Sequence, residues 1–109
     1  MNKYENVMRH MCELLDTEGI PYEVSEFQGG YQWKNIGDFD GGDIIIHRGS
    51  YNNDAGYVES YGMPWDDGDV TSCSVKEMVD LIAGRRTRPE NPYEYSIFDM
   101  FDSLKTFMF

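Results

Sequence analysis

Apolar residues near the N-terminus recur at spacings of three and four positions. They are Tyr4, Val7, Met8, Met11, Leu14 and Leu15. This spacing places them on one side of an amphipathic helix running from about Asn2 to Glu18. Gly19 is suited to the end of such a helix, and Pro21 prevents its continuation.

Two short β-prone runs follow the predicted helix. Tyr22 to Phe27 and Tyr31 to Ile36 are separated by Gln28-Gly29-Gly30, whose glycines can supply the positive φ angles of a tight turn. The two runs are therefore predicted to form a hairpin. In the second run, Tyr31 and Trp33 point to one face of the strand, and the polar residues between and after them point to the other.

Two more strands are predicted in the middle of the chain. Asp43 to Arg48 contains three consecutive isoleucines, a β-branched density typical of a central strand. In Gly56 to Tyr61 the side chains alternate between the two faces, so these two segments should form a second hairpin. Met63 to Cys73 is rich in Asp, Gly and Pro, and we expect it to be irregular.

Two helices are predicted after the strands. Ser74 and Glu77 have the spacing of a capping box, and Gly84 is a candidate end for the helix that begins there. Ser96 and Asp99 repeat the capping signal within residues 94–109. A strongly apolar stripe follows it, made of Ile97, Met100, Phe101, Leu104, Phe107 and Met108. This last helix could dock on the core of its own chain, on a partner, or on a second copy of the chain.

The order of these elements predicts an α+β fold. We expect an antiparallel four-stranded meander, with the N-terminal helix and two C-terminal helices packed on one face. A parallel, doubly wound sheet is disfavoured because it would require helices between successive strands. The length of 109 residues suits a single domain over residues 1–109.

Charge narrows the range of partners. The formal net charge is −11, and between Asp38 and Asp69 there are eight acidic residues and one basic residue, Arg48. Such a chain is not expected to bind nucleic acid directly or to attach to an anionic membrane, because both depend on Lys and Arg. A basic protein surface is the favoured partner. The alternative is that the charge only maintains solubility.

The remaining composition indicates a reduced, cytoplasmic protein. The two cysteines, Cys12 and Cys73, are too few for a disulfide scaffold, and the N-terminus carries charges where a secretory signal would be apolar. No apolar run approaches the roughly 20 residues of a membrane span.

No catalytic, metal or cofactor site is predicted. The acidic loop at Asp38, Asp40 and Asp43 superficially suggests a calcium site, but Gly49 stands where an EF-hand loop beginning at Asp38 requires its bidentate Glu. Cys73 with His47 is a weak candidate nucleophile pair. Zinc-ligand spacings and nucleotide-binding fingerprints are absent from the sequence, so a non-enzymatic protein is favoured over a small Cys/His or metal-dependent enzyme.

A basic cluster follows the first of the two predicted C-terminal helices. It consists of Arg85, Arg86 and Arg88. Cations are favourable at a helix C-terminus, which is one explanation. The other is a contact with an acidic partner or with the acidic middle of this chain.

One segment resembles a known group of proteins. GDIIIHRGSYNNDAGYVESYG, followed by an acidic loop and SVKEMVDLI, resembles small uncharacterised acidic proteins of Gram-positive phages and mobile elements. The resemblance covers a little over a third of the chain. It implies a phage or mobile-element origin more than an activity. Small acidic proteins of that origin are often inhibitors that imitate nucleic acid, of the anti-restriction or anti-CRISPR type, whose partner is a nucleic-acid-binding host protein.

These observations predict an acidic protein-binding module. Its candidate partner-binding residues are the acidic and aromatic side chains of the middle segment: Asp38, Asp40, Asp43, Asp54, Glu59, Asp66, Asp67, Asp69, Tyr51, Tyr57, Tyr61 and Trp65. The acids should be displayed to basic groups of the partner, and the flat aromatic side chains should act as anchors. A small homo-oligomeric structural or regulatory protein, assembled through the C-terminal helix, is the alternative.

Overall fold

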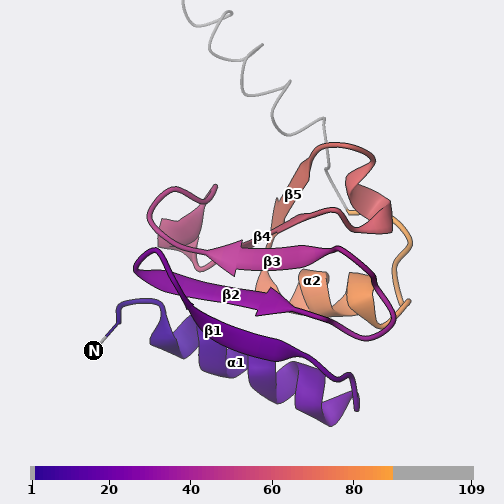
Figure 1. Cartoon of the computed structure of the whole chain (residues 1–109), viewed down its shortest axis with the longest axis horizontal. Coiled ribbons are helices and arrows are strands. Elements are labelled where there is room, and N and C mark those ends of the chain that lie inside the picture. Colours follow the sequence, from indigo (N-terminus) through magenta and orange to yellow (C-terminus); the bar gives the residue numbers. More distant parts are fainter. Residues whose placement is uncertain (1, 90–109) are drawn as a thin grey trace, which may run out of the picture.

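The computed structural model describes residues 2–89, which form one antiparallel sheet with two α-helices (Figure 1). The five strands are hydrogen-bonded in chain order. The elements are α1 (Glu5–Thr17), β1 (Glu23–Phe27), β2 (Gly30–Lys34), β3 (Asp43–Ile46), the 3₁₀ turn η1 (Asn53–Ala55), β4 (Val58–Tyr61), the 3₁₀ turn η2 (Pro64–Asp66), β5 (Val70–Cys73) and α2 (Val75–Ile82). The α+β class and the antiparallel meander are therefore confirmed.

The number of strands was predicted wrongly. The segment Met63–Cys73, expected to be irregular, contains η2 and a fifth strand, β5, which pairs with β4 from Val58↔Cys73 to Tyr61↔Val70. Pairing with β4 supplies the hydrogen bonds that make these four residues a strand, and local composition does not report on a tertiary partner.

Local signals correctly place the turns and helix ends. Gln28 and Gly29 both have positive φ, at 48° and 82°, so the β1–β2 connection is a tight two-residue turn. At the start of α2, the Ser74 hydroxyl accepts a hydrogen bond from the Glu77 backbone N–H at 3.2 Å. The predicted helix over residues 94–109, its docking and its role in assembly lie outside the described residues.

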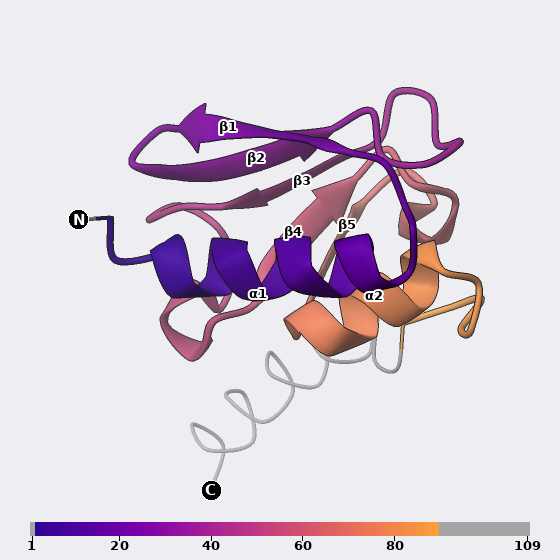
Figure 2. The same cartoon turned by 90° about the horizontal axis from the view of Figure 1, so that it is seen from below.

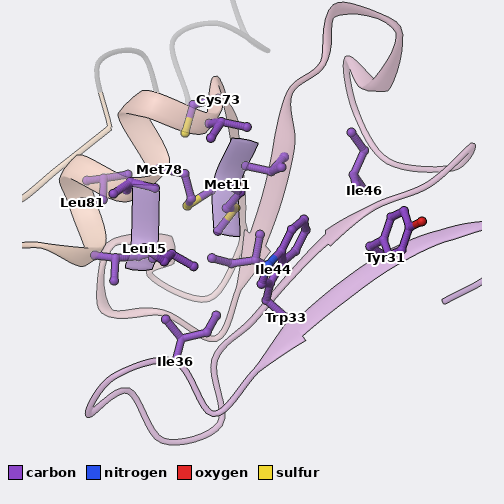
Figure 3. Packing of buried hydrophobic residues seen from close by; sticks show 14 of the residues in the cluster. Met11, Leu15, Tyr31, Trp33, Ile36, Ile44, Ile46, Cys73, Met78 and Leu81 are labelled. Carbon is purple, nitrogen blue, oxygen red and sulfur yellow. The ribbon is translucent and has the colours of Figure 1, made fainter. Parts of the chain in front are cut away.

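Both α-helices lie on the same side of the sheet (Figure 2). Strand residues alternate between this helix face and the opposite face, which we call the open face. Side chains from both helices and from the central strands form the core, where Trp33 and Ile44 meet Met11 (Figure 3). No helix in the described part of the chain is long and apolar enough to cross a membrane.

Candidate protein-binding surface

Two acidic loops lie at the same end of the sheet. The β2–β3 loop carries Asp38 and Asp40, and the β4–β5 loop carries Asp67 and Asp69. All four side chains are exposed, and neither loop contains a Lys or Arg. Figure 1 shows both loops at the right-hand end of the sheet, whereas η1 lies at the other end. We call these four residues the acidic end.

Apolar contacts hold the two loops together. The rings of Phe39 and Trp65 meet edge to face, with their centroids 5.5 Å apart. Gly62 allows the backbones to approach, because a Cβ at this position would lie 2.7 Å from the Gly41 carbonyl oxygen. The acidic end is therefore built on a packed base.

Two residues predicted to bind a partner instead support this base. Asp66 is only 2% exposed, and its carboxylate accepts hydrogen bonds from the Ser60 hydroxyl at 2.9 Å and from the Met63 backbone N–H at 3.0 Å. Trp65 donates its indole N–H to the same Ser60 hydroxyl at 3.0 Å. Asp66 is corrected to a structural residue, and burial raises the pKa of its carboxyl.

A row of side chains crosses the open face through all five strands. Its members are register partners on successive strands: Ser25, Gln32, Ile45, Glu59 and Ser72. Gln32, Ile45 and Glu59 are 7%, 7% and 9% exposed, although neither helix lies on this face. The prediction that Glu59 is displayed on the surface is therefore corrected, since it lies low between its neighbours.

A polar network links this row to the acidic end. Asp43 and Tyr61 are paired across β3 and β4, and the Tyr61 hydroxyl donates to the Asp43 carboxylate at 2.9 Å. The Gln32 side-chain amide donates to both groups, at 3.3 Å each. Burial and the Asp43 carboxylate both raise the pKa of Tyr61, so this hydroxyl remains a donor near neutral pH.

Glu59 lies at the centre of the open face. Its Oε1 atom accepts a hydrogen bond from the Tyr51 backbone N–H at 3.3 Å. Burial raises the pKa of Glu59, while this hydrogen bond and nearby His47 act in the opposite direction. The Tyr51 carbonyl accepts from the Ser72 hydroxyl at 2.9 Å, which fixes the backbone beside Glu59, and the Tyr51 side chain is 67% exposed.

The structure separates the other predicted residues from this surface. Asp54 is exposed in η1, at the opposite end of the sheet, and lies 3.5 Å from the Lys3 ammonium group. Tyr57 precedes β4 at that end and is half-buried. The residues predicted to bind a partner therefore fall into three groups. The first is the acidic end, and the second lies on or beside the open face: Asp43, Glu59, Tyr61 and Tyr51. The third consists of the supporting residues Trp65 and Asp66 and of Asp54 and Tyr57 at the opposite end.

Arg85 and Arg86 of the arginine cluster form ion pairs with acidic side chains on or beside the two helices. The Arg85 guanidinium pairs at 2.7 Å with Glu18 at the end of α1 and at 2.7 Å with Asp80 of α2. Arg86 lies 3.5 Å from Glu77. Arg85, which follows α2, therefore links the end of α1 to α2, and Arg86 lies against Glu77 of α2.

The candidate nucleophile pair is not assembled. Cys73 is buried in the core on the helix face, whereas the His47 ring contacts Phe27 of β1. Burial and the neighbouring Glu77 carboxylate raise the pKa of the Cys73 thiol, which keeps it protonated and unreactive. Among residues 2–89, no three His, Cys, Asp or Glu side chains come together as a group that could hold a metal ion.

Sequence reasoning missed Gln32. Its polar side chain between Tyr31 and Trp33 predicted only that it faces away from the core, as Lys34 does. Only the strand register shows that Gln32, Asp43 and Tyr61 lie side by side.

Comparisons with known proteins add no family to this description. No protein-family model, curated protein or solved structure matches the chain.

Proposed function

We propose that this protein is a non-enzymatic module that binds a basic surface of another protein through its acidic end. The observation that carries the proposal is the convergence of Asp38, Asp40, Asp67 and Asp69 from two loops onto one end of the sheet. Within residues 2–89, none of these four carboxylates has an ion-pair partner. By contrast, Glu18, Asp54 and Asp80 all have cations within 4 Å.

Uncompensated charge of one sign favours association. Four carboxylates at one end create a local negative potential that accelerates encounter with a positive surface and orients it. The Phe39 and Trp65 contact keeps the two loops together, so little order has to be gained on binding. The interaction should weaken as salt screens the exposed charges.

A nucleic-acid-binding protein is the partner class that we propose. Surfaces that bind phosphates present Lys and Arg, and these groups would equally bind carboxylates displayed on a rigid support. The resemblance of the middle segment to phage and mobile-element proteins supports the same class. An anti-restriction or anti-CRISPR inhibitor is the narrower form of this proposal.

Two double variants test the acidic end. Asp38→Asn with Asp40→Asn, and Asp67→Asn with Asp69→Asn, each remove two charges. Glu13→Gln with Glu26→Gln is the matched control, because both residues are exposed and lie away from the acidic end. Each protein is immobilised and exposed to a lysate of the cells from which the chain comes, at low and at high salt. Partners captured by the wild type and the control at low salt should be lost with either acidic-end variant.

Competition then tests the partner class. A captured partner is incubated with labelled DNA or guide RNA, and the wild-type protein should displace the nucleic acid. Binding without displacement would exclude mimicry but leave the module intact. Capture that persists at high salt and in both acidic-end variants would overturn the electrostatic proposal itself.

A further inference from the structure

A groove runs between α1 and α2, which lie side by side (Figure 2). It consists of two hollows of about 340 and 270 Å³, and Lys76 borders both. One hollow is lined by Val7 and Val75, near the beginnings of the two helices, and the other by Leu14 and Val79, in their second halves. We call the two hollows together the helix groove.

The walls of the helix groove are mainly apolar. Met11 and Leu15 of α1 are 0% exposed and pack in the core, whereas Val7 and Leu14 are only half-buried and border the groove. The apolar stripe of α1 is therefore wider than the part that the core covers. Lys76 adds the methylene groups of its exposed side chain, whose charged end can remain in water.

An apolar stripe that needs cover follows the described residues. It is the stripe of the helix predicted over residues 97–108, and Asp99, Asp102 and Thr106 lie on the opposite side of that helix. Soluble proteins rarely expose a contiguous apolar surface of this size, so the stripe is expected to pack against another surface. With the stripe turned inward, both carboxylates stay in water, and no charge has to be buried.

The stripe matches the helix groove in length. On α1, the residues that line the groove run from Asn6 to Glu18, which is roughly 18 Å of helix. Residues 97–108 span roughly 16 Å as a helix. The chain also leaves α2 beside the groove, since Arg85 lines its second hollow. Residues 86–96 are long enough to turn the chain back along the groove, and such a tether favours binding within one chain over binding to a separate molecule.

We infer that residues 97–108 form a third helix that lies in the helix groove of the same chain. Arg85 joins Glu18 beside α1 to Asp80 of α2, at 2.7 Å from each, so the spacing of the helices at this end is fixed before the segment docks. The inference is independent of the proposed function, because it concerns the helices, whereas the acidic end is formed by loops of the sheet.

Helical spacing gives the expected contacts. The segment enters the groove at the Arg85 end, so it should run antiparallel to α1 and place Ile97 near Leu14. Leu104 lies seven positions after Ile97, and Val7 lies seven positions before Leu14. Because seven residues make about two helical turns in each case, Leu104 should lie against Val7.

Nuclear Overhauser contacts in the full chain test the inference directly. The methyl groups of Ile, Leu and Val are ¹³C-labelled in otherwise deuterated protein. Contacts are expected from Ile97 to Leu14 and from Leu104 to Val7, in a protein that sediments as a monomer. A sample mixed from labelled and unlabelled chains should show no such contact between copies.

A double-mutant cycle tests the same contact through stability. Leu104→Ala should lower the midpoint of urea unfolding, because docked apolar surface is lost, whereas Thr106→Ser on the opposite side should leave the midpoint nearly unchanged. Val7→Ala removes one side of the contact, so Leu104→Ala should have a clearly smaller effect in that background. Met8→Ala is the matched control, since Met8 is half-buried in α1 but lines neither hollow. In that background the effect of Leu104→Ala should be undiminished.

Four results would overturn the inference. These are no contact from Ile97 or Leu104 to α1, contacts that occur only between copies, strictly additive effects of Leu104→Ala and Val7→Ala, and an unchanged urea midpoint in Leu104→Ala together with loss of partner capture. The second result would assign the groove to a second copy of the chain, and the last would assign the stripe to a partner. Capture by the acidic-end variants judges the proposed function separately, whichever of these results is obtained.

Discussion

The two faces of the sheet differ in how their polar side chains are hydrogen-bonded. On the helix face, Ser60 and Asp66 are buried and hydrogen-bonded to each other. On the open face, Gln32 and Glu59 are 7% and 9% exposed, and each has one side-chain oxygen that accepts no hydrogen bond from residues 2–89. These oxygens are open to water, because the Trp33 indole nitrogen is the only fully buried side-chain polar atom without a partner among those residues. The helix face therefore pairs the polar groups of Ser60 and Asp66 within the protein, whereas the open face leaves acceptors of Gln32 and Glu59 to water.

A truncation on the helix face should have the largest effect on stability. Trp33 is 0% exposed and packs against side chains from α1 and β3 (Figure 3). Trp33→Ala should lower the free energy of unfolding by about 3–5 kcal/mol, because it removes apolar contacts and leaves a cavity. Urea unfolding followed by circular dichroism measures this change.

Neighbouring positions provide the controls for that truncation. Lys34→Ala, at an exposed position of the same strand, should change stability by less than about 0.5 kcal/mol. Trp33→Phe should be much milder than Trp33→Ala, since it keeps most of the volume and removes an indole N–H that has no acceptor within residues 2–89. Equal losses for Trp33→Ala and Lys34→Ala would contradict the assignment of stability to the helix face.

Substitutions at two adjacent aspartates should differ in their effect on stability, by less than the core truncation does. Asp66→Ala leaves the Met63 N–H and the Ser60 hydroxyl without their acceptor, so it should cost about 2 kcal/mol. Asp67→Asn is the matched change at the next, exposed position, where φ is 49° and Asn is tolerated as well as Asp. It should leave the unfolding midpoint in urea nearly unchanged. A similar loss in both variants would show that Asp66 is not a structural residue.

These aspartates show what the sequence can and cannot reveal. Asp66 and Asp67 have the same chemistry and lie in the same loop, so no local pattern distinguishes the buried one from the exposed one. The distinction comes from Ser60, six residues earlier, whose inward orientation depends on the pairing of β4 with its neighbours. Apolar periodicity, by contrast, correctly predicted α1, α2 and the inward orientation of Tyr31 and Trp33, because these depend on local spacing.

The sequence predicted the candidate surface only in part. The β2–β3 and β4–β5 loops lie at the same end of the sheet because consecutive antiparallel strands reverse direction, and the composition of both loops predicted them to be acidic and exposed. The strand β5 and the relation of Gln32 to Glu59 were not predicted, since both depend on long-range register. The sequence therefore predicts the loops at the strand ends more reliably than it predicts which side chains lie side by side on neighbouring strands.

The smallest and most specific effect concerns pH. Burial raises the pKa of Glu59 above its ordinary value of 4.5, so the folded chain binds this proton more tightly than the unfolded chain does. Stability from this group therefore increases as the pH falls from neutrality through the folded pKa, and the gain is complete below 4.5. His47 of the β3–β4 loop and Asp66 of η2 also act on Glu59, and Asp66, whose own pKa is raised, contributes a change of the same sign.

The variant Glu59→Gln isolates the contribution of Glu59 to the pH dependence of stability. At pH 7 this variant should be more stable than the wild type, and the difference should shrink as the pH falls toward 4.5. Asp80 does not confuse the measurement, because Arg85 lowers the pKa of its carboxyl below 3.8 and its contribution is lost only under more acidic conditions. Urea unfolding at several pH values between 7 and 4.5 gives the slope, with the exposed-site variant Glu13→Gln as control. If the gap between Glu59→Gln and the wild type stayed constant or widened on acidification, the carboxylate would not be the unfavourable group on the open face, and the contrast between the two faces would lose its energetic basis.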